Sequence, residues 1–314
     1  MTQKQKMLSV VVPCYNEEEN IKNFYTELTK TLNKLDYDYE IIFVDDGSHD
    51  STWNEIKNIS GSDSVKAVSL SRNFGHPAAL EAGLNAAKGD AIVMMDADLQ
   101  HPPTVIPSLI KKWEEGFEIV KTIRLQTEGA SFFKKITSSL FYALLNTFSD
   151  LRLRDGEADF RLVDRSVLEI INKMPESPKF YRGLFNWVGF NTAEVEYKAA
   201  NRTRGKSSFT LKKMVELARL GLTSFSMLPL KIIITIGLGL SSVSFLALLV
   251  MVYVKLFVSF VFFSNNIILL TFLIFVTGLL STFQGIIAIY MVDVFDAAKG
   301  RPSYIVSKKV NLDD

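Results

Sequence analysis

Two aspartates separated by one small residue are the strongest chemical signal in the sequence. Asp96 and Asp98 follow the apolar segment 91–95, which has the composition of a buried strand. Both carboxylates of such a turn can lie on one side and share a divalent cation, and Mg²⁺ or Mn²⁺ prefers oxygen ligands. Gln100 can add an amide oxygen. We therefore predict a Mg²⁺ or Mn²⁺ site formed by Asp96, Asp98 and Gln100, which suits phosphate chemistry.

Three further polar clusters follow apolar segments in the same way. They are residues 13–17, 45–48 and 71–76, behind strands predicted at 8–12, 39–44 and 65–70. Segments with helical spacing separate these strands, which predicts an α/β domain with a mostly parallel sheet and helices on both faces. Such sheets bind ligands beyond the carboxyl ends of their strands, so the four clusters indicate a nucleotide-type site. Dinucleotide and P-loop sites are disfavoured because the glycine motifs of both are missing.

The last third of the chain has a different composition. Residues 232–254 and 267–292 contain no charged side chain. Each run exceeds the roughly 20 helical residues that cross a hydrocarbon core, so we predict transmembrane helices at about 231–255 and 267–292. Lysine and arginine are frequent before the first run and after the second, which predicts a multi-pass protein of the cell membrane with both termini and the catalytic domain in the cytoplasm. A buried helical hairpin in a soluble core is the alternative.

Four regions follow from this division. The catalytic α/β domain is predicted at 1–200, a juxtamembrane region of amphipathic helices at 201–229, the transmembrane hairpin at 230–293 and a cytoplasmic tail at 294–314. Residues 131–148 and 209–228 are apolar with a few lysines and an arginine, which is typical of helices lying on a bilayer surface. Ordinary amphipathic packing on the sheet is the alternative for both segments.

Overall charge and cysteine usage limit the alternatives. The formal net charge is +1, which gives no reason to expect a nucleic acid as partner. Cys14 is the single cysteine, so no intrachain disulfide can form. A catalytic thiol would need a histidine partner, and a small buried residue at a strand end is the better interpretation of Cys14.

Together the motifs identify a family. The sequence resembles glycosyltransferase family 2, and within it the polyprenyl-phosphate sugar transferases, with a layout most similar to the bacterial bactoprenol glucosyltransferase type. The segments that carry this resemblance are 11–18, 43–48, 70–76, 95–100, 159–162 and 300–302. The resemblance implies a GT-A (Rossmann-like) catalytic domain that transfers a sugar, with inversion, from a nucleotide-sugar to undecaprenyl or another polyprenyl phosphate. UDP-glucose and UDP-N-acetylglucosamine are the favoured donors.

The resemblance also implies roles for individual residues. Nucleotide-sugar contacts are expected from Pro13, Tyr15, Asn16, Glu17, Asp45, Asp46, Asp96, Arg204 and Lys206. Acceptor-phosphate contacts are expected from Arg124, Lys134 and Lys135. Catalytic roles are expected for Asp98, Arg124 and Asp159. Residues 155–158 depart from the approach to Asp159 that is usual among relatives, which puts the geometry around Asp159 in doubt.

Asp159 has two possible roles. Relatives carry an acidic residue here that is often proposed as a base. A lipid phosphate monoester, however, has a second pKa of about 6 and is largely a dianion at neutral pH. Such a nucleophile needs no base, so Asp159 can instead orient a basic group or the sugar. A structural carboxylate paired with Arg161 is the third interpretation.

Two functions are alternatives to sugar transfer to a polyprenyl phosphate. A processive polysaccharide synthase of the same family would carry a Gln-x-x-Arg-Trp motif and more membrane helices, and the sequence has neither. A non-catalytic membrane scaffold would have no need of Asp96 and Asp98. The resemblance further implies a small flippase and a second glycosyltransferase as partners, and assembly into homo-oligomers.

Overall fold

The structure, a computed structural model, describes residues 6–125, 157–176, 179–198 and 265–312, together with isolated positions between 246 and 257. The chain divides into two compact units, of which the first comprises 1–218 and 302–314 and the second 219–301. Both predicted interfacial segments lie wholly or largely outside the described residues. So do four predicted site residues: Lys134, Lys135, Arg204 and Lys206.

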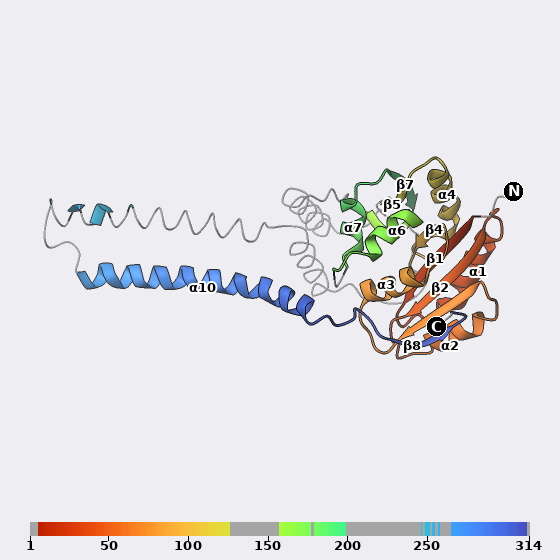
Figure 1. Cartoon of the computed structure of the whole chain (residues 1–314), viewed down its shortest axis with the longest axis horizontal. Coiled ribbons are helices and arrows are strands. Elements are labelled where there is room, and N and C mark those ends of the chain that lie inside the picture. The colour runs from red at the N-terminus through yellow and green to blue at the C-terminus, as the bar shows by residue number, and fades with distance from the viewer. Residues whose placement is uncertain are drawn as a thin grey trace. The chain divides into compact units, whose positions relative to one another are not determined.

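The first unit is built around one eight-stranded sheet with the order β7-β5-β6-β4-β1-β2-β3-β8 (Figure 1). Its strands are β1 Met7–Cys14, β2 Asp38–Asp45, β3 Val65–Leu70, β4 Ala91–Met94, β5 Ile119–Leu125, β6 Glu157–Asp164, β7 Thr192–Lys198 and β8 Val306–Val310. Strands β3, β2, β1 and β4 are mutually parallel, and β7 is parallel to β5. Strands β6 and β8 are antiparallel to their neighbours. The predicted mostly parallel α/β sheet is confirmed.

Helices cover both faces of the sheet because the central strands are apolar on both sides. The helices of this unit are α1 Ile21–Leu32, α2 Thr52–Ile59, α3 His76–Ala86, the 3-10 turn η1 Pro103–Val105, α4 Ile106–Glu114, α6 Arg165–Asn172 and α7 Tyr181–Trp187. Val10 and Val12 of β1 share a core cluster with Phe24 of α1. Val11 points the other way, toward Gly83 of α3. Alternation along one strand therefore fills two cores.

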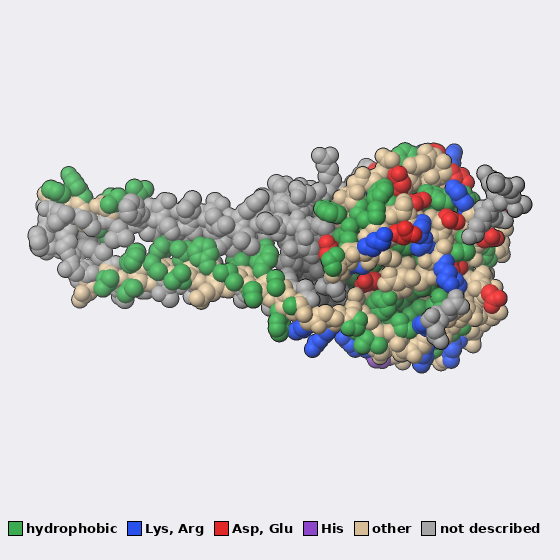
Figure 2. All heavy atoms as spheres, in the orientation of Figure 1, with side chains coloured by type: hydrophobic (Ala, Val, Ile, Leu, Met, Phe, Trp, Pro, Cys, Tyr) green, Lys and Arg blue, Asp and Glu red, His purple; other side chains and the backbone are tan. Residues whose placement is uncertain are grey.

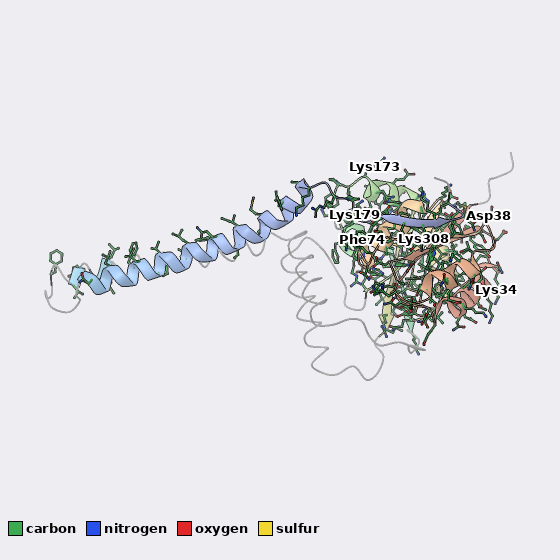
Figure 3. The ribbon with its side chains drawn as sticks, turned by 90° about the horizontal axis from the view of Figure 1, so that it is seen from below. Lys34, Asp38, Phe74, Lys173, Lys179 and Lys308 are labelled. Carbon is green, nitrogen blue, oxygen red and sulfur yellow. The ribbon has the colours of Figure 1, made fainter. Side chains whose placement is uncertain are left out.

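The region from 294 onward, predicted as a tail, is part of other elements. Residues 294–298 continue α10, and 306–310 form β8, which pairs antiparallel with β3 at the edge of the sheet (Figure 3, where Lys308 marks β8). The amide of Ser71 donates to the carbonyl of Ile305 at 2.9 Å. The Asn311 side chain donates to the carbonyls of residues 60, 62 and 65. The sequence alone does not predict this strand. Two of its five residues are lysines, and lysines in this region are used only to predict the orientation in the membrane.

The described part of the second unit is mainly α10, Asn265–Ala298. Large apolar side chains such as Leu269, Phe272 and Ile287 are exposed along it (Figure 2). Among the residues that the structure describes, no helix has the length and apolarity required to cross a membrane. The transmembrane hairpin at 230–293 is therefore a prediction from the sequence alone.

The contact between α3 and the sheet generates a stability prediction. A Cβ atom on Gly83 would lie 2.3 Å from Cγ1 of Val11 and 3.0 Å from Cγ2 of Val44. Because a packed core cannot absorb this overlap, we expect Gly83→Ala to lower the free energy of unfolding by about 1–3 kcal/mol. Gly61→Ala is the matched control, since nothing lies within 4 Å of that position. Thermal unfolding measures both, and equal melting temperatures would contradict the packing described here.

Candidate active site

The four predicted polar clusters meet at one edge of the sheet. Because β1, β2, β3 and β4 are parallel, the loops that follow them leave from the same side. Hydrogen bonds join each loop to the next. The Asn16 amide donates to Ser48 Oγ at 2.9 Å, the Phe74 amide to Asp46 Oδ1 at 2.8 Å, and His76 Nε2 lies 3.1 Å from Asp96 Oδ1. The four clusters therefore lie together at one edge, as expected from the sheet, and their use as a nucleotide site stays a prediction.

The loop after β1 presents an exposed aromatic side chain on a fixed backbone. Tyr15 is 40% exposed, whereas Pro13 is buried within β1. Asn16 has a φ of 54°, and its side-chain oxygen accepts the His49 amide at 3.0 Å. The Glu17 amide donates to Thr52 Oγ1 at 2.8 Å. The loop is therefore held by the neighbouring β2–α2 connection, and Tyr15 is an aromatic side chain that it leaves exposed.

Asp45 and Asp46 lie inside the site and support its loops. Both are buried, with exposed fractions of 2% and 3%. Asp45 accepts the Ser48 amide and the Ser69 hydroxyl, and Asp46 accepts the amides of Phe74 and Gly75. Burial and the nearby Asp45 charge raise the pKa of Asp46, while the two amide hydrogen bonds oppose that shift. Oxygens of both carboxylates thus accept hydrogen bonds from the protein itself. The expected contact of Asp45 and Asp46 with the nucleotide stays a prediction.

The turn after β4 holds the predicted metal ligands. Asp98 Oδ1 accepts the Gln100 amide at 3.0 Å, and Leu99 between them adopts a φ of 58°. A positive φ at a leucine costs energy and is found mostly where a site requires the turn. Gln100 Oε1 accepts a hydrogen bond from Arg124 Nη1 at 3.1 Å. The structure thus brings the expected acceptor-phosphate arginine, at the end of β5, next to the expected metal turn.

Two histidines flank Asp96. The Asp96 amide donates to Nδ1 of His101, which is buried and stacked on Phe160 with ring centroids 5.2 Å apart. Burial alone would lower the pKa of His76, but its hydrogen bond to Asp96 and the charges of Asp96 and Asp159 raise that pKa to about 9. Burial would raise the pKa of Asp96, yet His101 and His76 hold it below its usual range. His76 ends the predicted cluster 71–76, and no role is assigned to either histidine from the sequence, although His101 directly follows the aspartate motif.

The Asp96–Gln100 turn fits a divalent cation that keeps positions for substrate. Among the described residues, no three histidine, cysteine or acidic side chains are clustered as ligands. Two carboxylates on one turn, with Asp96 38% exposed, leave most coordination positions to water and phosphate oxygens, as Mg²⁺ commonly requires. The donor set therefore suits a metal bound jointly by protein and substrate better than a metal enclosed by protein alone.

Asp159 is bound by an arginine that the sequence did not reveal. Arg182 of α7 donates Nε to Asp159 Oδ1 at 3.1 Å and Nη2 to Oδ2 at 2.9 Å. Arg161, the partner considered from sequence, lies farther away, with Nη2 3.8 Å from Oδ1. Burial would raise the pKa of Asp159, but the charges of Arg182, His76 and Arg161 hold it well below its usual range. No sequence pattern links Asp159 with Arg182, because they lie on different elements and meet only through the fold.

The comparisons with known proteins agree with this geometry. The sequence profile described as "Glycosyl transferase family 2" matches residues 9–171. An uncharacterized glycosyltransferase of Bacillus subtilis, YkcC, is 39% identical over 98% of this chain and 95% of its own length. A prophage bactoprenol glucosyl transferase homolog of Escherichia coli is 42% identical over 73% of this chain and 76% of its own length.

A solved structure shows the same fold. Glucosyl-3-phosphoglycerate synthase from Mycobacterium tuberculosis, crystallised with Mn²⁺, uridine diphosphate and phosphoglyceric acid, aligns with a TM-score of 0.50 at 22% identity. The alignment covers 69% of this chain and 76% of that chain. The sheet is therefore GT-A-like, and the protein is a glycosyltransferase. The profile match and the identities of the relatives place the chain in glycosyl transferase family 2.

Asp46 generates a prediction about the loop after β3. An asparagine in its place can accept only one of the two amides, of Phe74 and Gly75, that the carboxylate accepts. We expect Asp46→Asn to speed hydrogen exchange of these amides about tenfold or more, because a charged hydrogen bond is lost. Asp63→Asn, at an exposed position, is the matched control. Unchanged exchange at both amides would show that Asp46 does not hold the loop.

Proposed function

We propose that this glycosyltransferase moves a sugar, with inversion, from a UDP-sugar to a polyprenyl phosphate such as undecaprenyl phosphate. The relatives named bactoprenol glucosyl transferase support this acceptor. A UDP-type donor is supported by the solved protein of the same fold that was crystallised with uridine diphosphate. UDP-glucose is the first donor to test and UDP-N-acetylglucosamine the second.

One observation carries the proposal within the structure. The hydrogen bond between Gln100 and Arg124 places a fixed cation beside the Asp96–Gln100 turn. A site that joins two phosphate-bearing substrates needs positive charge at this junction, because the substrates otherwise repel each other. Arg124 is exposed and so is open to a phosphate.

The chain's own residues have distinct tasks in this mechanism. Tyr15 and the loop anchored by Asp46 shape the nucleotide side, and Arg124 attracts the acceptor phosphate. Asp96 and Asp98, with Gln100, would hold Mg²⁺ or Mn²⁺, which when bound offsets the charge of the diphosphate leaving group. His76 lies within hydrogen-bond distance of Asp96 and, when protonated, balances its charge. These residues are therefore in position before the anionic substrates bind.

We further propose that the protein works at the cell membrane with its catalytic domain in the cytoplasm. The proposal is supported by the two charge-free runs, 232–254 and 267–292, and by the basic residues that flank them. A polyprenyl acceptor is itself confined to the bilayer, so such spans would keep the enzyme where its substrate is.

The assay is transfer of labelled sugar into the lipid phase by detergent-solubilised full-length protein. The reaction contains undecaprenyl phosphate, Mg²⁺ or Mn²⁺, and one UDP-sugar at a time. We expect one donor to yield product, and Asp96→Asn or Asp98→Asn to lower the rate about a hundredfold or more because leaving-group charge is no longer offset.

Controls separate this function from its rivals. Asp63→Asn removes a remote carboxylate and is expected to keep full activity, and EDTA is expected to abolish activity reversibly. A polymeric, lipid-free product would favour a polysaccharide synthase. Folded protein that binds nucleotide but transfers sugar to no lipid would favour a scaffold, and either result would contradict the proposal.

A further inference from the structure

The carboxylate of Asp159 is held on both of its oxygens. Arg182 contacts Oδ1 through Nε and Oδ2 through Nη2, at 3.1 and 2.9 Å, which is the two-pronged geometry that guanidinium and carboxylate groups favour. Arg161 adds positive charge 3.8 Å from Oδ1. Each oxygen keeps a further lone pair, but the arginine charge stabilises the ionised carboxylate and so makes it a weaker proton acceptor.

Arg182 is itself fixed by the structure. Its side chain is 18% exposed, and it stands on α7 one turn before Asn186. Asn186 binds Glu157 of β6 at 3.3 Å and also the buried Lys121 of β5. These contacts hold the inner face of α7 against β5 and β6, so Arg182 has little freedom to leave Asp159.

Other side chains of the described site are also occupied. His76 Nε2 is bonded to Asp96 Oδ1, and His101 Nδ1 accepts the Asp96 amide. Asp96 and Asp98 belong to the turn suited to a cation. Within the described residues that surround Asp159, no carboxylate or imidazole is placed as a ready proton acceptor.

The geometry points to Arg182 as a positioning residue that anchors and neutralises Asp159, so that the reaction uses no protein base and requires an acceptor that is already ionised. This inference rests on the proposed function, which already names a phosphate monoester acceptor, and deepens it by giving Arg182 a role and a reason why an alcohol would not serve as acceptor. An alcohol would have to lose a proton during attack, whereas a phosphate monoester is largely a dianion at neutral pH.

The transfer then balances without a proton. An oxygen of the acceptor phosphate dianion forms a bond to the anomeric carbon as the bond from that carbon to the β-phosphate oxygen breaks. The bonding electron pair leaves with the uridine diphosphate, which gains one negative charge. The acceptor becomes a singly charged phosphodiester, so total charge is conserved.

The ion pair also removes a repulsion. An unpaired Asp159 would repel an incoming phosphate dianion, and Coulomb interactions are stronger in a partly buried site than in water. Arg182 cancels this charge. Among the residues that the structure describes, the charged groups that face Asp159 are Arg182 of α7, Arg161 of β6, His76 at the start of α3 and Asp96 after β4. Of these, the arginine on α7 makes the direct contact with both oxygens.

The first test uses the wild-type protein and compares acceptors. Farnesyl phosphate and farnesyl phosphonate differ in their second pKa, and farnesol has no phosphate. We expect the acid limb of kcat/KM to shift with the second pKa of the acceptor, and farnesol to accept no sugar. An acid limb that stays in place for both acceptors, or transfer to farnesol, would overturn the inference while leaving glycosyl transfer intact. Absence of transfer to every phosphate would overturn the proposed function itself.

The second test compares single variants of Arg182 with a charge-compensated double variant. We expect Arg182→Gln to raise the KM for farnesyl phosphate about tenfold or more, because a partly buried carboxylate loses its partner, with a much smaller change in the KM for the UDP-sugar. Adding Asp159→Asn to this variant removes the uncompensated charge and is expected to recover most of the lost acceptor affinity. Arg182→Lys keeps the positive charge but loses the two-pronged guanidinium contact. Its KM for farnesyl phosphate is expected to lie between that of Arg182→Gln and that of the double variant.

Controls keep the variant series interpretable. Lys173→Gln changes an exposed lysine elsewhere in this unit (labelled in Figure 3) and is expected to leave both KM values unchanged. Thermal unfolding of each variant identifies loss of fold. A base at Asp159 would make Asp159→Asn lose about a hundredfold or more in kcat, and the double variant would stay as inactive as the single one. That pattern would overturn the inference.

Discussion

Repulsion between negative charges is the constraint that shapes this site. Three aspartates, Asp96, Asp98 and Asp159, lie around a reaction centre whose proposed substrates are themselves anions. Each of two aspartates has a cationic or hydrogen-bonding partner from a different element: His76 for Asp96 and Arg182 for Asp159. Arg124 lies beside the Asp96–Gln100 turn, where it donates a hydrogen bond to Gln100. The positive groups are thus distributed so that phosphates can approach a carboxylate-rich edge.

The sheet makes this distribution possible. Parallel pairing of β1, β2, β3 and β4 sets the carboxyl ends side by side, so residues as distant as Asn16 and Asp96 contribute to one surface. The antiparallel β6 enters from the opposite direction beside β4, and it carries Asp159 and Arg161 near its start. Because β6 is antiparallel to β4, the start of β6 lies at the edge where β4 ends. Asp159 and Arg161 therefore reach the same edge as the loops of the parallel strands. Helix α7 then adds Arg182 from outside the sheet.

Sequence alone predicted the parts of the fold that depend on local pattern. Val10, Val11 and Val12 predict a strand buried on both faces, and Asp96 and Asp98 stand out because a strand precedes them. The pairing of Asp159 with Arg182 could not be predicted from the sequence, because it depends on how α7 packs on β6. The same holds for β8, whose pairing with β3 depends on a return of the chain after α10. The two amides that Asp46 accepts were also not predictable, because a motif match cannot distinguish a carboxylate that binds ligand from one that binds loop amides.

Direct sugar transfer is tested most directly at the bond between the anomeric carbon of the sugar and the lipid phosphate. The sugar of the UDP donor is labelled at its anomeric carbon with a magnetic carbon isotope, and the lipid product is examined by phosphorus NMR. We expect one phosphodiester signal, split by coupling to the labelled carbon, with the anomeric configuration inverted relative to the donor. A product in which the labelled carbon is not joined to the lipid phosphate through oxygen, or a lipid diphosphate, would contradict direct sugar transfer to a polyprenyl phosphate.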